Sequence, residues 1–151
     1  MKVKIKSLEP NSVIPSYARP GDAGMDLTAT SKFFDEYGNI CYGVGLAFEI
    51  PEGYVGLVFP RSSCSKKQLV LANAVGVIDS GYRGEVVVKF KPSLALDREQ
   101  YCKHIRMYEL YNIGDKVAQM IIMPYPHIEF EETDELSETE RGDGSYGSTG
   151  K

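Results

Sequence analysis

The sequence of 151 residues is poor in the side chains that build disulfide, zinc and histidine-dependent sites. Its three cysteines, Cys41, Cys64 and Cys102, are odd in number and show no C-x-x-C spacing. That pattern argues against a disulfide framework or a zinc cluster and fits a reducing compartment. The two histidines, His104 and His127, have no plausible nucleophile or metal ligand beside them in the sequence. A histidine-based triad or metal site is therefore disfavoured.

Long apolar runs and an excess of positive charge are also missing. No run approaches the ~20 apolar residues that cross a bilayer, and residues 1–4 lack the apolar stretch of a signal peptide. We therefore expect no membrane partner and a cytoplasmic protein. The net charge of −4 gives no general attraction to nucleic acids, so no direct nucleic-acid binding is expected. A polyphosphate ligand would need local basic groups and a divalent cation to screen its charge.

What the sequence does contain is a series of short apolar or alternating runs separated by glycine and proline, typical of strands joined by tight turns. We expect strands over residues 3–6, 45–50, 54–59, 85–90 and 117–123. Short helical pieces are candidates over residues 69–74 and 94–111. The pattern predicts an all-β sandwich or barrel of the jelly-roll kind.

The composition changes near residue 129. Residues 129–140 contain seven Asp or Glu side chains, which is typical of a solvated tether. We therefore divide the chain into a β domain over residues 1–128 and a flexible C-terminal arm over residues 129–151, made of the acidic tether and a glycine-rich lid.

The end of the arm has the chemistry of a nucleotide lid. Hydroxyls, backbone amides and arginine suit phosphate oxygens, and a tyrosine ring offers a face for a base. The spacing of its glycines is one residue too long for a P-loop. The alternative is a disordered Gly/Ser tail, and the segment taken alone leaves both interpretations open.

Four internal segments place polar groups next to predicted strands, and each has an ordinary structural alternative. Asp26 begins an apolar strand, where a turn aspartate would look the same. Residues 60–67 follow a strand with hydroxyls and cations that suit phosphate, although a charged loop looks similar. Residues 73–85 form a predicted hairpin that carries a carboxylate, an aromatic ring and an amide; a hairpin with polar turn residues is the alternative. Residues 114–119 open the last strand with a glutamine able to point inward.

Taken in order, these segments and the arm resemble the five motifs of the homotrimeric dUTPase (deoxyuridine 5'-triphosphate nucleotidohydrolase) family. The matching stretches are 23–27 (AGMDL), 60–63 (PRSS), 76–85 (GVIDSGYRGE), 114–119 (GDKVAQ) and 141–150 (RGDGSYGSTG). They span nearly the whole chain, and the third and fifth are the most specific. The resemblance implies a distorted jelly-roll, or β-clip, domain and a homotrimer whose sites are shared between subunits.

The resemblance also implies an activity: hydrolysis of dUTP to dUMP and pyrophosphate with Mg2+ as cofactor, which limits uracil in DNA and supplies dUMP. Asp79 would be the general base that activates water for attack at the α-phosphorus. Tyr82 would pack under the deoxyribose and exclude a 2′-hydroxyl. The uracil edge would be bound by Asn73 and by the backbone of Gly76, Val77 and Ile78.

The remaining assignments concern the triphosphate. Asp26 would act near the metal through water, the Mg2+ being held mainly by substrate phosphates. The phosphates would be held by Arg61, Ser62, Ser63 and Gln119. The arm would contribute Arg141, Tyr146, Gly147, Ser148 and Thr149, with Tyr146 stacked on the uracil and Arg141, Ser148 and Thr149 on the γ-phosphate.

The chain departs from the family pattern at three places. Ser145 stands where the family usually has glycine, and Tyr146 replaces the more usual phenylalanine. Residues 91–112 are longer than the resemblance leads us to expect. They form either a longer hairpin or short helix that caps the sheet, or a surface for a protein partner, and the sequence leaves both open.

Two other functions are weighed against dUTP hydrolysis. The related dCTP deaminase carries a catalytic glutamate where Lys89 stands and a proline where Ser80 stands, which disfavours deamination. A non-catalytic module could use a nucleotide-dependent lid, but a pure binder would not need Asp79.

Overall fold

The computed structural model describes residues 1–67, 69–93 and 110–145, which form strands and one short 3₁₀-helix, η1 (Ser62–Lys66). The all-β prediction is confirmed. The strands are β1 (Lys4–Ser7), β2 (Met25–Thr28), β3 (Phe33–Phe34), β4 (Ile40–Gly43), β5 (Leu46–Glu49), β6 (Tyr54–Pro60), β7 (Leu69–Leu71), β8 (Gly76–Ile78), β9 (Val87–Pro92) and β10 (Lys116–Pro124).

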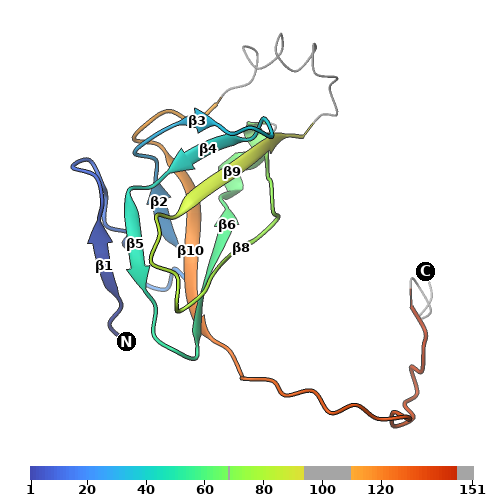
Figure 1. The fold of residues 1–151 in the computed structure, drawn as a ribbon. Coiled ribbons are helices and arrows are strands. Elements are labelled where there is room, and N and C mark those ends of the chain that lie inside the picture. The colour runs from blue at the N-terminus through green and yellow to red at the C-terminus, as the bar shows by residue number, and fades with distance from the viewer. Residues whose placement is uncertain (68, 94–109, 146–151) are drawn as a thin grey trace.

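The strands build two antiparallel sheets of four strands each, in the orders β2-β10-β6-β8 and β3-β4-β9-β7 (Figure 1). β1 pairs with β5 in a separate two-stranded sheet. The long strand β10 lies between β2 and β6 and pairs with both. This arrangement of two sheets confirms the jelly-roll prediction.

The core lies between the sheets and follows from the period-2 pattern of the strands. On β9, Val88 and Phe90 are buried while Lys89 is exposed. Phe90 packs with Tyr42 and Tyr111, the three ring centroids lying 5.7–6.0 Å apart. Side chains from both sheets belong to this one cluster, so the sheets fold as a unit.

Two expectations about local structure are wrong. Residues 69–74 do not form a helical piece, because Leu69–Leu71 is the strand β7, paired with β9, and a turn follows it. So short a helix has too few hydrogen bonds to compete with a strand ladder.

The hairpin predicted over residues 73–85 is also wrong in detail. β8 pairs with β6 in one sheet while β9 pairs with β4 and β7 in the other, so residues 79–86 cross between sheets. Of the helix candidate over 94–111, all but the last two residues lie outside the described ranges.

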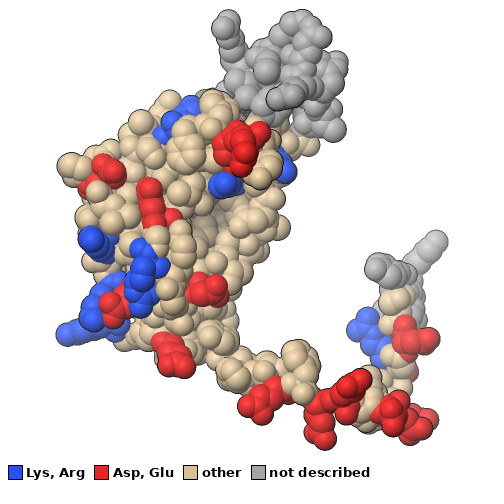
Figure 2. All heavy atoms as spheres, in the orientation of Figure 1, with Lys and Arg blue, Asp and Glu red and all other residues tan. Residues whose placement is uncertain are grey.

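The arm leaves the β body after β10 and extends away from it (Figure 1). Every residue from 123 to 143 is exposed, including Phe130 at 96% and Leu136 at 87%. The acidic side chains of the tether are spread along this segment (Figure 2). Within the described ranges, no helix has the length and apolar character that crossing a membrane requires.

Candidate functional site

The ends of three strands meet around the carboxylate of Asp26 on β2. Its Oδ1 accepts a hydrogen bond from Arg61 Nε at 2.7 Å, and its Oδ2 lies 2.8 Å from Lys116 Nζ. We call Asp26, Arg61 and Lys116 the cation cluster. Two positive charges against one negative charge leave it with a net charge of +1.

The cation cluster keeps its carboxylate ionised. Partial burial would raise the pKa of Asp26, but hydrogen bonds from Lys116 and Arg61, together with their charges, outweigh burial and hold that pKa below its ordinary value. The arrangement therefore offers fixed positive charge at the end of β6, which suits a polyanion.

Backbone register explains why the predicted phosphate-binding residues meet here. Gln119 on β10 lies opposite Asp26 on β2 and opposite Phe59 on β6. Its Nε2 donates to the carbonyl of Pro60 at 3.0 Å, so the glutamine is fixed beside the residue that precedes Arg61. The chain then turns into η1, where Ser62 and Ser63 follow. Arg61 Nη1 donates to Ser63 Oγ at 3.4 Å.

Lys116 was not singled out from the sequence. It is the first residue of β10, and its ammonium group reaches across to Asp26 on the neighbouring strand. The available signal was its position in the fourth segment, directly before the strand that carries Gln119. Because strand pairing decides which side chains become neighbours, that signal needed the register of β2 against β10.

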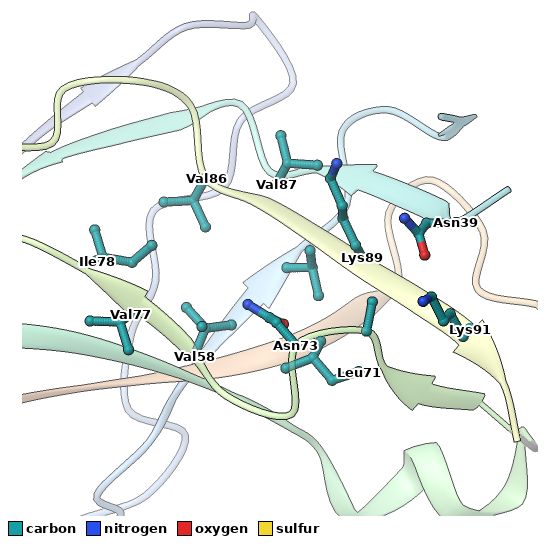
Figure 3. Close-up of a pocket in the computed structure, with 13 residues that line it drawn as sticks. Asn39, Val58, Leu71, Asn73, Val77, Ile78, Val86, Val87, Lys89 and Lys91 are labelled. Atoms are coloured by element: carbon teal, nitrogen blue, oxygen red, sulfur yellow. The ribbon is translucent and has the colours of Figure 1, made fainter. Parts of the chain in front are cut away.

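A second region, a pocket of about 330 Å3, lies between β8 and β9 (Figure 3). Four of the residues predicted to bind the uracil, Asn73, Gly76, Val77 and Ile78, line it. The opposite wall is mostly apolar and comes from Val86, Val87 and Val88, with Lys89 and Lys91 along β9 (Figure 3). A space with apolar side chains on one wall and an amide and backbone groups on the other suits a small planar base.

Asp79 and Tyr82 lie on the crossing between the two sheets, which begins directly after β8. The backbone N–H of Tyr82 donates to the carbonyl of Asp79 at 3.1 Å. Both side chains are exposed, Tyr82 by 45%. The carboxylate of Asp79 is thus open to an incoming ligand and to water.

Asp79 and Arg61 are not brought together within one copy of the chain. Ile78 pairs with Gly56 near the start of β6, whereas Arg61 follows the last residue of that strand. Five steps of extended chain from Gly56 to Arg61 cover about 17 Å. Asp79 lies one residue further beyond Ile78, so Asp79 and the cation cluster lie toward opposite ends of β6.

The arm places Arg141 outside the β body. Its Nε donates to the carbonyl of Gly144 at 3.0 Å, within a turn of the arm itself. The other arm residues singled out from the sequence, Tyr146, Gly147, Ser148 and Thr149, lie outside the described residues. The part of the chain that is described contains no group of three or more His, Cys, Asp or Glu side chains that could hold a metal ion.

Comparisons with known proteins agree with the resemblance. A model of the dUTPase family matches residues 11–97 and 103–150. The deoxyuridine 5'-triphosphate nucleotidohydrolase of Corynebacterium glutamicum is 40% identical over 151 residues, covering 99% of this chain and 95% of that protein. That of Nautilia profundicola is 39% identical over 153 residues and covers 100% of both.

A solved structure shows the same fold. The dUTPase of Staphylococcus bacteriophage 80alpha, determined with dUPNHPP, superposes with a TM-score of 0.77 at 27% identity, covering 99% of this chain and 98% of that one. The family match and the curated relatives extend over nearly the whole chain. The chain therefore belongs to the dUTPase family, a family of enzymes.

Proposed function

We propose that this protein hydrolyses dUTP to dUMP and pyrophosphate, which limits uracil in DNA and supplies dUMP. The observation that carries the proposal is the pocket between β8 and β9, whose lining contains Asn73, Gly76, Val77 and Ile78. These are the residues that the family resemblance assigns to the uracil. The names of the curated relatives, which match nearly the whole chain, support the same substrate.

Asp79 is the general base in this mechanism. Its exposed carboxylate takes a proton from a water molecule while the water oxygen attacks the α-phosphorus. The bond from the α-phosphorus to the bridging oxygen breaks, and pyrophosphate leaves with that oxygen. Direct attack by water needs positioning and charge neutralisation rather than a protein nucleophile.

The cation cluster neutralises the triphosphate. Arg61 provides a guanidinium that can bind phosphate oxygens in pairs, and Lys116 adds a second charge. Ser62, Ser63 and Gln119 supply neutral hydrogen bonds from η1 and β10. Asp26 holds both cations in place through its two carboxylate oxygens.

Mg2+ fits this site as a hydrated ion. Mg2+ keeps several waters and is commonly bound by one or two carboxylates together with substrate phosphates. Asp26 has its oxygens on Arg61 and Lys116, so it suits contact through water rather than direct coordination. Bound there, the ion would spread the negative charge of the phosphates.

Base and sugar are read by shape. The amide of Asn73 and the backbone of Gly76, Val77 and Ile78, which line the pocket, pair with the uracil edge. The same segment of the chain excludes the thymine methyl group. The ring of Tyr82 lies under the deoxyribose and excludes a 2′-hydroxyl.

Each complete site draws on more than one subunit of a homotrimer. The distance along β6 between Asp79 and Arg61 supports this, because about 17 Å of extended strand separates the two groups within one copy. The arm of a neighbouring subunit, residues 129–151, closes over the site with Arg141, Tyr146, Gly147, Ser148 and Thr149. Its extended, exposed tether has the reach for such a crossing.

A single assay tests the activity. The protein is incubated separately with dUTP, dCTP, dTTP and UTP in the presence of Mg2+, and pyrophosphate and ammonia are measured. Pyrophosphate from dUTP, with little from the other nucleotides, supports the proposal. Ammonia from dCTP, or no turnover of any nucleotide, would contradict it.

A further inference from the structure

The crossing between the sheets, residues 79–86, is held by hydrogen bonds of its own although much of it is exposed. We call it the Tyr82 loop. Arg83 Nη1 donates to the carbonyl of Ser80 at 2.6 Å and to that of Tyr82 at 3.0 Å. Together with the turn from Asp79 to Tyr82, these bonds fix the backbone on both sides of the tyrosine.

The side chain of Tyr82 is placed by the two residues that follow Arg83. Its hydroxyl donates to the carbonyl of Glu85 at 2.9 Å. Its ring occupies the space that a side chain at position 84 would need. A Cβ on Gly84 would lie 2.5 Å from the Tyr82 hydroxyl oxygen and 2.6 Å from Cζ, far inside normal contact distance. Only glycine at position 84 permits this ring position.

Glu85 in turn is anchored to the β domain. Its Oε1 accepts a hydrogen bond from the backbone N–H of Gly45 at 2.8 Å, in the turn between β4 and β5. The next residue, Val86, is buried and exchanges backbone hydrogen bonds with Val44 and Leu46. The Glu85 carbonyl, which accepts the hydrogen bond from the Tyr82 hydroxyl, is therefore held in place in two ways: by the Glu85 side chain and by the backbone of Val86.

We propose that Gly84 and Glu85 are positioning residues that set the Tyr82 ring and, through it, the selectivity for deoxyribose over ribose. This inference rests on the proposed function, in which the Tyr82 ring faces the sugar. Neither residue is among those assigned to the nucleotide. Gly84 acts by leaving space for the ring, and Glu85 by holding the carbonyl that orients the hydroxyl.

The expected consequence is a change in selectivity rather than a loss of folding. The atoms that a Cβ at position 84 would meet belong to the outer end of the Tyr82 side chain, so a methyl group there pushes the ring aside instead of disrupting the core. Gly84 is not among the glycines with a positive φ, so alanine adds no backbone strain there. A displaced ring opens room for a 2′-hydroxyl and weakens contact with deoxyribose. Misplacement of a positioning group by 1 Å can cost about 100-fold in rate.

The test compares Gly84→Ala with Gly81→Ala. Gly81 lies in the same loop, has no positive φ, and a Cβ there would meet nothing within 4 Å, so it is a matched control. The quantity measured is the ratio of kcat/KM for dUTP to kcat/KM for UTP. We expect Gly84→Ala to lower this ratio by about tenfold or more and Gly81→Ala to leave it unchanged. Thermal unfolding of both variants shows whether each is folded.

A second pair of variants tests the anchor. Glu85→Gln keeps an oxygen that can accept the Gly45 N–H, so it should retain the selectivity ratio. Glu85→Ala removes the acceptor and should lower the ratio. If Gly84→Ala lowers the two kcat/KM values equally, or Glu85→Ala matches Glu85→Gln, the positioning role is wrong while dUTP hydrolysis stands. If the wild-type protein does not hydrolyse dUTP, the proposed function itself fails.

Discussion

The two halves of the candidate site are held by different forces. The base half, Asn73 with β8 and the Tyr82 loop, is fixed by strand pairing, loop hydrogen bonds and a valine wall. The phosphate half, the cation cluster, is fixed by two ion pairs that share the carboxylate of Asp26. Shape should therefore govern nucleotide binding at the base half, and charge should govern it at the phosphate half. Variants, salt and pH can separate these two contributions.

The largest effect is expected from Asp79→Asn, which removes the proposed general base but keeps a side chain of the same shape. General-base catalysis contributes ~10²–10⁴-fold, so kcat should fall by that order. Because Asp79 lies outside the ion pairs of the cation cluster, binding of a non-hydrolysable dUTP analogue should persist. Pyrophosphate release and calorimetric titration measure the two effects. Loss of binding together with kcat would assign Asp79 a structural role.

Removal of residues 141–151 should come next, because it deletes the lid and leaves both halves in place. Loss of transition-state hydrogen-bond donors costs ~10²–10³-fold in kcat, and a drop of that order is expected. Size-exclusion chromatography with light scattering should still show a folded trimer. Full activity in the truncated protein would refute the lid, and a monomer would place the trimer contacts in the arm.

A smaller effect separates shape from charge directly. Asn73→Ala and Lys116→Met should each raise KM for dUTP, the first by roughly tenfold through a lost hydrogen bond to the uracil. Salt screens exposed charges, and the Lys116 side chain is 52% exposed. High salt should therefore shrink the Lys116→Met effect and leave the Asn73→Ala effect unchanged. Equal salt dependence of the two variants would contradict the division of the site.

The smallest effect concerns stability. The folded pKa of Asp26 is lowered, so its ion pairs stabilise the folded state above the unfolded pKa and lose that contribution as the pH falls through the folded value. Compared with Asp26→Asn, the wild-type protein should gain up to about 1 kcal/mol near neutral pH. That gain should begin to fall near pH 4 and be lost as the pH drops through the lower folded pKa. Thermal unfolding of both proteins across this range measures the difference, and a constant difference would exclude the ion pairs as its source.

Local patterns predicted the two longest strands well, because apolar runs bounded by glycine and proline mark them. The runs 54–59 and 117–123 became β6 and β10 with one added residue or two at the ends. The helix expected over 69–74 was wrong because pairing of β7 with β9 outweighs the local preference of six residues. The hairpin predicted around Asp79 was wrong because strands distant in the sequence decide the pairing. β8 pairs with β6 in one sheet, and β9 pairs with β4 and β7 in the other.

The sequence by itself determined the kind of chemistry, the order of the five segments and the all-β class, since residue types and spacing are local properties of the chain. Only the tertiary structure decided that Lys116 joins Asp26 and Arg61, that Asp79 and Arg61 lie at opposite ends of β6, and that Gly84 makes room for the Tyr82 ring. The reason is that strand register and side-chain contact join residues far apart in the chain, and neither is encoded in any one segment.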